Sequence, residues 1–311
     1  MGSGYVIACA LTAKKGWAMV KILRKFLVIP ILLLALFLSG CARKTEKGTL
    51  QVVASIAPLA YFAERIGGRH VSVSVMVPPG GNPHSYEPSP RQMVRLGEAT
   101  LFIKAGSGVE FELDWMERFL SLNHTLKLCN AVEGIRLIPI KHNGDVHQNG
   151  RYDPHYWLSP ANGIIIAGNV KRALIAVDPL HRMEYAANCA KLSAELQLLD
   201  EEIHRKLAGL KSRSFLVFHP AWGYYADAFQ LDQIAVEEEG KTLTPRQMQR
   251  VIEKARASRI SVVFVSPQFS TVQAEAIARD IGGVTGTVDP LARDYQENLR
   301  RATAAFIRGM Q

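Results

Sequence analysis

The sequence predicts an α/β fold in which two parallel-sheet lobes are joined by one long rigid helix. Short apolar segments alternate with helical segments in both halves of the chain, a pattern typical of parallel sheets covered by helices. Between the halves, residues 179–210 keep a helical pattern that is too long for a lobe of this size. We therefore expect a first lobe at 50–178, the linker helix at 179–210 and a second lobe at 211–311.

The first lobe should contain strands, helices and one exposed loop. The apolar runs 50–55 and 101–103 and the alternating, valine-rich segment 71–77 predict strands. Residues 141–150 are polar and rich in Gly and Asn, so this stretch, which includes His142 and His147, is expected to be an exposed loop. Helical patterns follow or separate these segments at 59–66, 92–97, 112–120 and 161–177.

The linker helix is predicted from the spacing of its apolar residues. Steps of three and four place six of them on one face of a helix: Leu192, Leu196, Leu199, Ile203, Leu207 and Leu210. Asp178 would cap the helix, with Pro179 in its first turn. Unbroken, residues 179–210 would extend about 48 Å at ~1.5 Å per residue.

The second lobe resumes the alternation of strands and helices. Thr244, Pro245 and Gln247 have the pattern of a capping box at a helix start. The other helices are expected at 222–229, 272–281 and 294–308, and the strands at 214–218, 233–236, 260–265 and 286–288.

The N-terminal segment is expected to target the chain rather than to fold with it. Five Lys or Arg residues precede the apolar run 26–38, which is short for a membrane span and contains Pro30. Residues 1–40 are therefore predicted to be a lipoprotein signal peptide, or alternatively an uncleaved signal anchor. Met19 opens a signal peptide of ordinary shape and is an alternative start.

Cys41 is the predicted site of lipid attachment. The apolar run ends in Leu38-Ser39-Gly40-Cys41, which resembles a bacterial lipobox. Cleavage before Cys41 would leave residues 41–49 as a polar tether between the lipid and the first lobe. The protein is thus expected outside the cytoplasm, anchored to a bacterial membrane.

The composition makes nucleic acid an improbable partner. The chain has 37 Lys and Arg against 28 Asp and Glu, and five of the 37 lie in the targeting segment, which leaves 32. The remainder shows no basic run of the kind that is typical of nucleic-acid-binding proteins. It contains two cysteines, Cys129 and Cys189, and the sequence leaves open whether they form a disulfide.

Three histidines and one aspartate share a recurring setting. His84, His155 and His219 each adjoin a proline and lie near aromatic residues, and Asp289 also precedes a proline. His219 and Asp289 directly follow predicted strands, where open α/β sheets place their sites. Three imidazoles and a carboxylate suit a borderline-soft divalent metal ion. We therefore predict a metal site in the cleft between the lobes; the alternative is hydrogen-bonded histidines and a turn aspartate.

Other residues near these motifs have possible supporting roles. Glu87 is either a carboxylate that orients an imidazole or a surface residue. Trp157 and Trp222 are expected to pack the walls of the cleft and exclude water. The acidic run 237–239 is expected in a loop near the mouth of the cleft. Four other histidines are expected on solvated faces: His70, His124, His181 and His204.

Six segments, taken in order, resemble one protein family over nearly all of the chain beyond Cys41. This is the ZnuA/TroA-like family of zinc and manganese solute-binding proteins of bacterial ABC importers. The segments are Ser55-Ile56-Ala57-Pro58-Leu59, Asn82-Pro83-His84-Ser85-Tyr86-Glu87-Pro88-Ser89-Pro90, Asp153-Pro154-His155-Tyr156-Trp157, His219-Pro220-Ala221-Trp222-Gly223-Tyr224, Ser266-Pro267-Gln268-Phe269-Ser270 and Asp289-Pro290-Leu291.

The resemblance implies a high-affinity metal-binding protein that delivers its ion to an ABC importer permease. His84 and His155 would be the ligands from the first lobe, and His219 and Asp289 those from the second. Manganese members carry glutamate at the position of His219, so zinc is favoured and manganese, or a mixed preference, is the alternative. The chain is expected to be a monomer and not an enzyme.

Two other functional classes are alternatives. Three histidines and a water also form a catalytic zinc shell, so a secreted zinc hydrolase is an alternative, although the chain contains no HExxH motif. Cell adhesion is compatible with some relatives, but no separate module supports it here.

Overall fold

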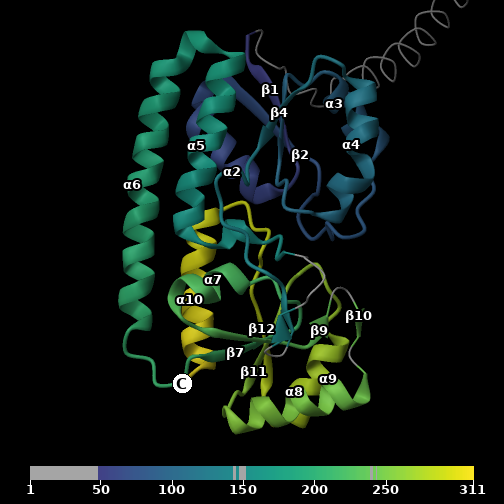
Figure 1. Cartoon of the computed structure of the whole chain (residues 1–311), viewed down its shortest axis with the longest axis vertical. Coiled ribbons are helices and arrows are strands. Elements are labelled where there is room, and N and C mark those ends of the chain that lie inside the picture. Colours follow the sequence, from purple (N-terminus) through teal and green to yellow (C-terminus); the bar gives the residue numbers. More distant parts are fainter. Residues whose placement is uncertain (1–47, 143–144, 147–151, 239–240, 243) are drawn as a thin grey trace, which may run out of the picture. The chain divides into compact units, whose positions relative to one another are not determined.

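The computed structural model describes residues 48–142, 145–146, 152–238, 241–242 and 244–311. The predicted signal peptide, Cys41 and His147 lie outside the described residues, as does the side chain of His142. Residues from Gly48 to Gln311 cluster as one compact unit. Within this unit, two four-stranded sheets, their helices and a long connecting helix confirm the predicted fold class (Figure 1). No helix in the described part of the chain is both long and apolar enough to cross a membrane.

The first sheet has four parallel strands in the order β2-β1-β3-β4. They are β1 (Leu50–Ala54), β2 (Val71–Val75), β3 (Leu101–Lys104) and β4 (Lys127–Asn130). The sequence predicts the first three but not β4. This edge strand buries only Cys129 of its four residues, so it lacks the apolar run that marks the others.

Helices cover both faces of the first sheet. On one side α2 (Ala57–Gly67) and α5 (Pro160–Val177) pack between the sheet and the linker helix, whereas α3 (Pro90–Gly97) and α4 (Glu110–Leu122) lie on the other side (Figure 1). Ser89 and Gln92 form a capping box that starts α3. The predicted exposed loop contains a short antiparallel pair, β5 (Lys141–His142) and β6 (Asp145–Val146).

The linker helix is shorter than predicted and begins differently. A 3₁₀ turn, η3 (Pro179–His181), precedes α6 (Arg182–Leu207), whose 26 residues extend about 39 Å at ~1.5 Å each. Asp178 makes no capping hydrogen bond; its Oδ2 instead accepts from His181 Nδ1 and Tyr185 Oη, both at 2.6 Å. The apolar face is as predicted up to the helix end, with these residues buried: Leu192, Leu196, Leu199, Ile203 and Leu207.

The second sheet is also parallel, in the order β12-β11-β7-β8. Its strands are β7 (Ser214–Val217), β8 (Asp232–Ala235), β11 (Val262–Val265) and β12 (Val284–Thr287). Each of the four strands begins and ends within two residues of its predicted boundaries. The acidic run was predicted to form a loop. Its first two residues instead form the short strand β9 (Glu237–Glu238), which pairs with the equally short antiparallel strand β10 (Lys241–Thr242).

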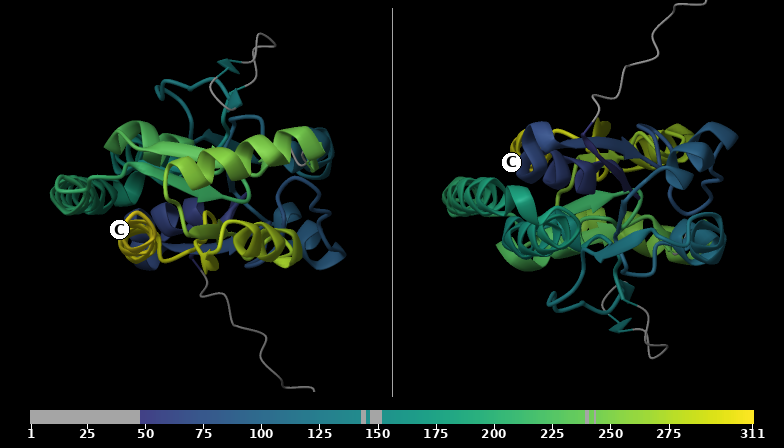
Figure 2. Two further views of the ribbon diagram at one scale, coloured as in Figure 1. Left: turned by 90° about the horizontal axis from the view of Figure 1, so that it is seen from below. Right: turned by 90° about the horizontal axis from the view of Figure 1, so that it is seen from above.

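Alternating side chains of the second sheet enter two different cores. Helices α8 (Pro245–Ala257) and α9 (Val272–Asp280) lie side by side on one face (Figures 1 and 2), where Leu216, Val263 and Val265 are buried with them. The predicted Thr244–Gln247 capping box starts α8. The opposite face, covered by α7 (Gly223–Phe229) and α10 (Tyr295–Gly309), belongs to a core that continues into the first lobe.

The C-terminal helix α10 ties the second lobe to the first. The Tyr295 ring packs against Phe62 of α2, with centroids 5.0 Å apart, and its hydroxyl donates to the Trp157 carbonyl at 2.6 Å. Nearby, Arg65 of α2 pairs with Glu195 of α6 at 2.6 Å. Because apolar packing and hydrogen bonds cross between the lobes at several places, the lobes share one core rather than only a linker.

Two further expectations are settled by the described side chains. Cys129 and Cys189 are both buried and free, so the possible disulfide is not formed. Burial raises the pKa of the Cys129 thiol to about 12, so this cysteine is inert at neutral pH. His70 and His181 are not simply solvated, because their rings stack at 3.6 Å and each contacts a carboxylate, Glu184 and Asp178 respectively.

Candidate metal centre

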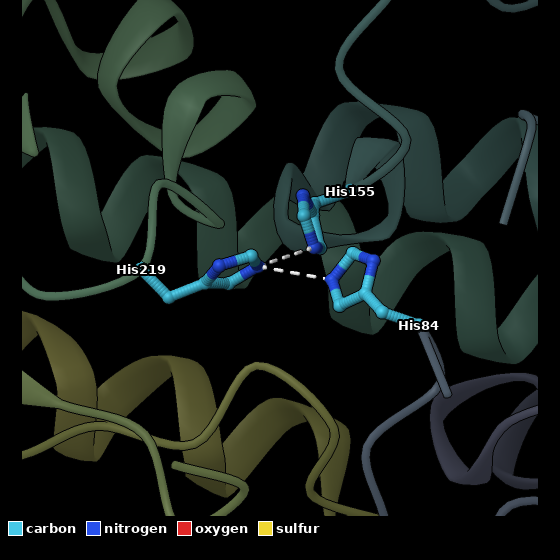
Figure 3. Close-up of side chains that lie close together, drawn as sticks. All are labelled: His84, His155 and His219. Atoms are coloured by element: carbon cyan, nitrogen blue, oxygen red, sulfur yellow. Dashed lines mark hydrogen bonds between the residues drawn. The ribbon is translucent and has the colours of Figure 1, made fainter. Parts of the chain in front are cut away.

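Three of the four predicted ligands meet between the two lobes. His84 follows β2 by a loop, His155 immediately precedes the 3₁₀ turn η2 (Tyr156–Leu158), and His219 lies two residues beyond β7. Their ring nitrogens point toward one another (Figure 3): Nε2 of His219 lies 3.3 Å from Nε2 of His84 and 3.4 Å from Nε2 of His155. One nitrogen from each ring lies within 4.8 Å of the others. Among the described residues, this is the only group of three or more potential ligands with the spacing of a metal site.

His155 is held by the aspartate two residues before it. Asp153 Oδ1 accepts from the His155 backbone N–H at 2.9 Å and from its Nδ1 at 2.8 Å, and both side chains are buried. Gly223, at the start of α7, makes room for this carboxylate, because a Cβ there would lie 2.3 Å from Asp153 Oδ2. The Trp157 ring closes another side, 5.4 Å from the His155 ring.

His219 is the most enclosed of the three imidazoles. Its Nδ1 lies 3.1 Å from Glu237 Oε1, and the Phe269 ring stacks on it with centroids 4.6 Å apart. Burial lowers the pKa of His219 to about 4, and the hydrogen bond to Glu237 only partly opposes this effect. His219 is therefore neutral at physiological pH, the form in which an imidazole binds a metal ion.

His84 lies on the open side of the group, with a quarter of its side chain exposed. Its backbone N–H donates to Asn82 Oδ1 at 3.0 Å, which fixes the loop, and its Nδ1 lies 2.7 Å from Glu110 Oε2 at the start of α4. Partial burial tends to raise the pKa of Glu110, but the hydrogen bond to His84 outweighs this effect, so the pKa is lowered. Glu110 is thus an ionised acceptor for His84.

The three carboxylates orient the imidazoles in the same way. A carboxylate can only accept a hydrogen bond, so each neutral ring must carry its proton on Nδ1. The lone pairs of the three Nε2 atoms then point toward one another, and they repel unless a cation lies between them. Carboxylate partners of this kind also raise the basicity of ligating histidines. A group of three nitrogen donors arranged in this way could hold a divalent ion that prefers nitrogen ligands.

Asp289, the fourth predicted ligand, is not brought into this group. Its Oδ1 accepts from Gln268 Nε2 and from the Leu291 backbone N–H, both at 2.9 Å. Of the predicted supporting residues, only Trp157 borders an imidazole. Glu87 is exposed, and Trp222 is buried against Phe306, with ring centroids 5.1 Å apart.

The carboxylates that hold the rings are residues that the sequence reading missed. Asp153 belongs to the same motif as His155, and its position two residues before that histidine is a signal in the sequence for their contact. Glu110 and Glu237 lie 26 and 18 residues from the histidines that they contact. Glu237 was expected in a loop at the cleft mouth and is instead a buried residue beside the site. Only the folded chain brings these pairs together.

Solved structures of known proteins share this fold. A crystal structure of ZnuA superposes with a TM-score of 0.80 at 36% identity and covers 85% of this chain and 100% of that chain. A ZnuA deletion mutant lacking residues 138–173, with zinc bound, gives a TM-score of 0.79 at 36% identity and covers 85% of this chain and 98% of that chain.

Curated relatives include proteins named for different metals. The zinc-binding lipoprotein AdcA of Streptococcus pneumoniae is 25% identical over 291 residues, covering 89% of this chain. The chain spans only 57% of the length of that relative. The manganese-binding lipoprotein MntA of Halalkalibacterium halodurans is 26% identical over 301 residues, covering 90% of this chain and 96% of the relative.

The family assignment rests on a match that extends across both lobes. Residues 52–309 match the family described as zinc-uptake complex component A, periplasmic. This range includes all but the first two residues of the two sheets, the linker helix and all three clustered histidines. The chain therefore belongs to the ZnuA family of periplasmic zinc-uptake complex components.

Proposed function

We propose that this chain is the extracytoplasmic zinc-binding component of an ABC importer and that His84, His155 and His219 hold the ion. The observation that carries the proposal is the arrangement of the three Nε2 atoms, which lie within 4.8 Å of one another. Each ring also has a carboxylate at its Nδ1. A site prepared in this way binds an ion with little rearrangement of the protein, which favours affinity.

The donor set favours zinc over manganese. Three imidazole nitrogens suit zinc, whereas manganese prefers oxygen ligands and a higher coordination number. The 36% identity to a ZnuA crystallised with zinc supports the same choice. The relative named for manganese keeps manganese, or a mixed preference, as the second candidate.

The partners and the location follow from the family. A zinc-uptake complex component must pass its ion to a membrane permease, and the related AdcA and MntA are named as lipoproteins. We therefore propose a permease of an ABC importer as the partner, and attachment to the membrane through lipid on Cys41. The chain would act as a monomer, since both lobes that contribute histidines belong to the same chain.

A zinc hydrolase is the competing class, because the group of ligand atoms within 4.8 Å of one another among the described residues consists of three imidazoles without a carboxylate. A three-histidine zinc ion with an open position can activate water. Hydrolysis also needs a base, and the three carboxylates beside the rings are engaged by Nδ1 atoms. We propose a carrier without catalytic activity, and hydrolytic assays on the zinc-loaded protein would reveal an enzyme.

Metal binding by the purified protein tests the proposal directly. Zinc affinity should be measured by competition with a chromophoric chelator for the wild type, for His219→Ala and for a matched control, His124→Ala, which removes an exposed imidazole. His219→Ala should lose more than the roughly 10- to 100-fold expected for an outer-shell change, and His124→Ala should bind as the wild type does. Wild-type affinity in His219→Ala would refute the three-histidine site.

A further inference from the structure

Glu112 is a buried carboxylate in the first turn of α4, and it holds the loop that leads into this helix. The residue is only 4% exposed. Its Oε1 accepts from the Ala105 N–H at 2.6 Å and its Oε2 from the Gly106 N–H at 2.8 Å, so both oxygens engage the β3–α4 loop (residues 105–109). Burial raises the pKa of Glu112, and the two backbone hydrogen bonds only partly oppose this effect. Burying a carboxylate is costly, and perturbed carboxylates of this kind are concentrated at functional sites.

The β3–α4 loop in turn holds the residues on both sides of His155. Ser107 Oγ donates to the carbonyl of Pro154, the residue before His155, at 2.8 Å. The Ala105 carbonyl accepts from the hydroxyl of Tyr156, the residue after His155, also at 2.8 Å. The segment that carries this histidine is therefore attached to the loop by two hydrogen bonds, one on either side of the imidazole.

The same turn of α4 also holds the segment that carries His84. Glu110 Oε2 lies 2.7 Å from His84 Nδ1, and the Phe111 N–H donates to the Pro83 carbonyl at 3.2 Å. Residues two positions apart in a helix are separated by roughly 200° around its axis, so Glu110 and Glu112 face different sides of α4. One turn of a helix thus contacts the His84 segment directly and the His155 segment through the β3–α4 loop.

We propose that Glu112 is a positioning residue for metal binding, which holds the β3–α4 loop and so sets the placement of the His155 imidazole relative to that of His84. This inference rests on the proposed function of the three histidines. Distances between a metal ion and its ligands tolerate deviations of only about 0.2 Å, so a small shift of the loop is enough to weaken the site. Glu112 therefore supports affinity without touching the ion.

The substitution Glu112→Gln tests the proposal. It keeps the length of the side chain but replaces one acceptor oxygen with an amide donor, so that one of the two backbone N–H groups faces another donor. Zinc affinity, measured by competition with a chromophoric chelator, should fall on the order of tenfold, as for other outer-shell partners. Glu117→Gln makes the same change at an exposed position of the same helix and should bind zinc as the wild type does.

A double-mutant cycle separates a positioning role from a merely structural one. Zinc affinities are measured for Glu112→Gln, for Ser107→Ala and for the variant that combines them. Because both changes act through the same loop, the combined loss of affinity should be clearly smaller than the product of the two single losses. The visible spectrum of bound Co²⁺, which depends on coordination geometry, should also change in Glu112→Gln and not in Glu117→Gln. A loss of folding stability alone would leave the Co²⁺ spectrum of the folded protein unchanged.

A second variant keeps the proposal testable if Glu112→Gln does not fold. The combination of Ser107→Ala with Tyr156→Phe removes the two hydrogen bonds through which Glu112 is proposed to act on His155, and it should also lose on the order of tenfold in zinc affinity. Wild-type affinity in folded Glu112→Gln or in this combined variant would overturn the proposal. Strictly independent losses in the double-mutant cycle would overturn it as well.

Failure of this inference can be told from failure of the proposed function. If His219→Ala loses zinc binding but Glu112→Gln does not, only the role of Glu112 is wrong. If His219→Ala binds zinc like the wild type, the three-histidine site itself is wrong, and the role of Glu112 falls with it.

Discussion

The buried His219 should make the metal-free protein lose stability as the pH falls below neutral. Burial lowers the pKa of His219 to about 4, whereas an imidazole in the unfolded chain keeps its ordinary value of 6.5. Between these two values the unfolded chain binds a proton at this position and the folded chain does not. Mass action then favours the unfolded state, so the contribution is destabilising and grows as the pH falls from 6.5 to about 4.

The size of the effect follows from the gap between the two pKa values. One pKa unit corresponds to about 1.4 kcal/mol, so His219 should cost about 3 kcal/mol of folding free energy at pH 4 relative to pH 7. Below pH 4 the folded state also binds the proton, and the loss stops increasing. The total free energy of unfolding of a protein is about 5–15 kcal/mol. The titration of this single side chain therefore accounts for a large part of the stability that the protein loses in acid.

The assay is urea unfolding in the presence of a chelator at several pH values between 7.5 and 4. His219→Asn is the test variant, because an asparagine amide resembles the Nδ1 side of the ring and can still donate to Glu237 without titrating. The wild type should lose about 3 kcal/mol more than His219→Asn over this range. The exposed-site variant His124→Asn should follow the wild type. Equal losses in wild type and His219→Asn would refute the argument.

Four further measurements test the sequence analysis and the structure together. Zinc affinity should weaken between pH 7 and about pH 5, but chelator competition should show fewer than three protons exchanged per ion, because His219 stays neutral down to about pH 4; a three-proton dependence would count against its low pKa. His219→Glu should narrow the preference for zinc over manganese without reversing it, as measured by competitive titration; an unchanged preference would argue against ligation at this position. Solution scattering with and without zinc should give nearly superimposable curves, because contacts such as Gln296–Tyr61 and those of Tyr295 tie the lobes together; a large contraction would contradict this. Cys41→Ser should release the protein from the membrane fraction or leave it unprocessed, because the lipid attachment site is lost; normal cleavage with retained attachment would show that Cys41 is not the lipid site.

Local patterns in the sequence were sufficient for most of the fold. The strands of the second sheet follow from short apolar runs, and α6 follows from leucines spaced by three and four residues. These elements can be predicted because the pattern of a strand or an amphipathic helix lies within the residues of the element itself. The histidines could be predicted for a similar reason, since each adjoins a proline in a short motif of its own.

Features that depend on contacts between residues far apart in the sequence could not be predicted in this way. Strand β4 exposes three of its four residues and forms by pairing with β3, so its own sequence carries little signal. The predicted cap at Asp178 is absent because His181 and Tyr185 compete for its carboxylate. In each case the local rule applied, but a contact made in the folded chain decided the outcome.

The sequence by itself determined the two α/β lobes, the connecting helix and the three histidines that meet between them. The tertiary structure alone decided which carboxylates orient those rings, that Gln268 and Leu291 engage Asp289, and that one core runs through both lobes. The physical reason is the range of the interactions. Helix and strand patterns arise between residues a few positions apart, whereas a hydrogen bond such as His84–Glu110 joins residues 26 positions apart. Such partners become neighbours only once both elements have packed.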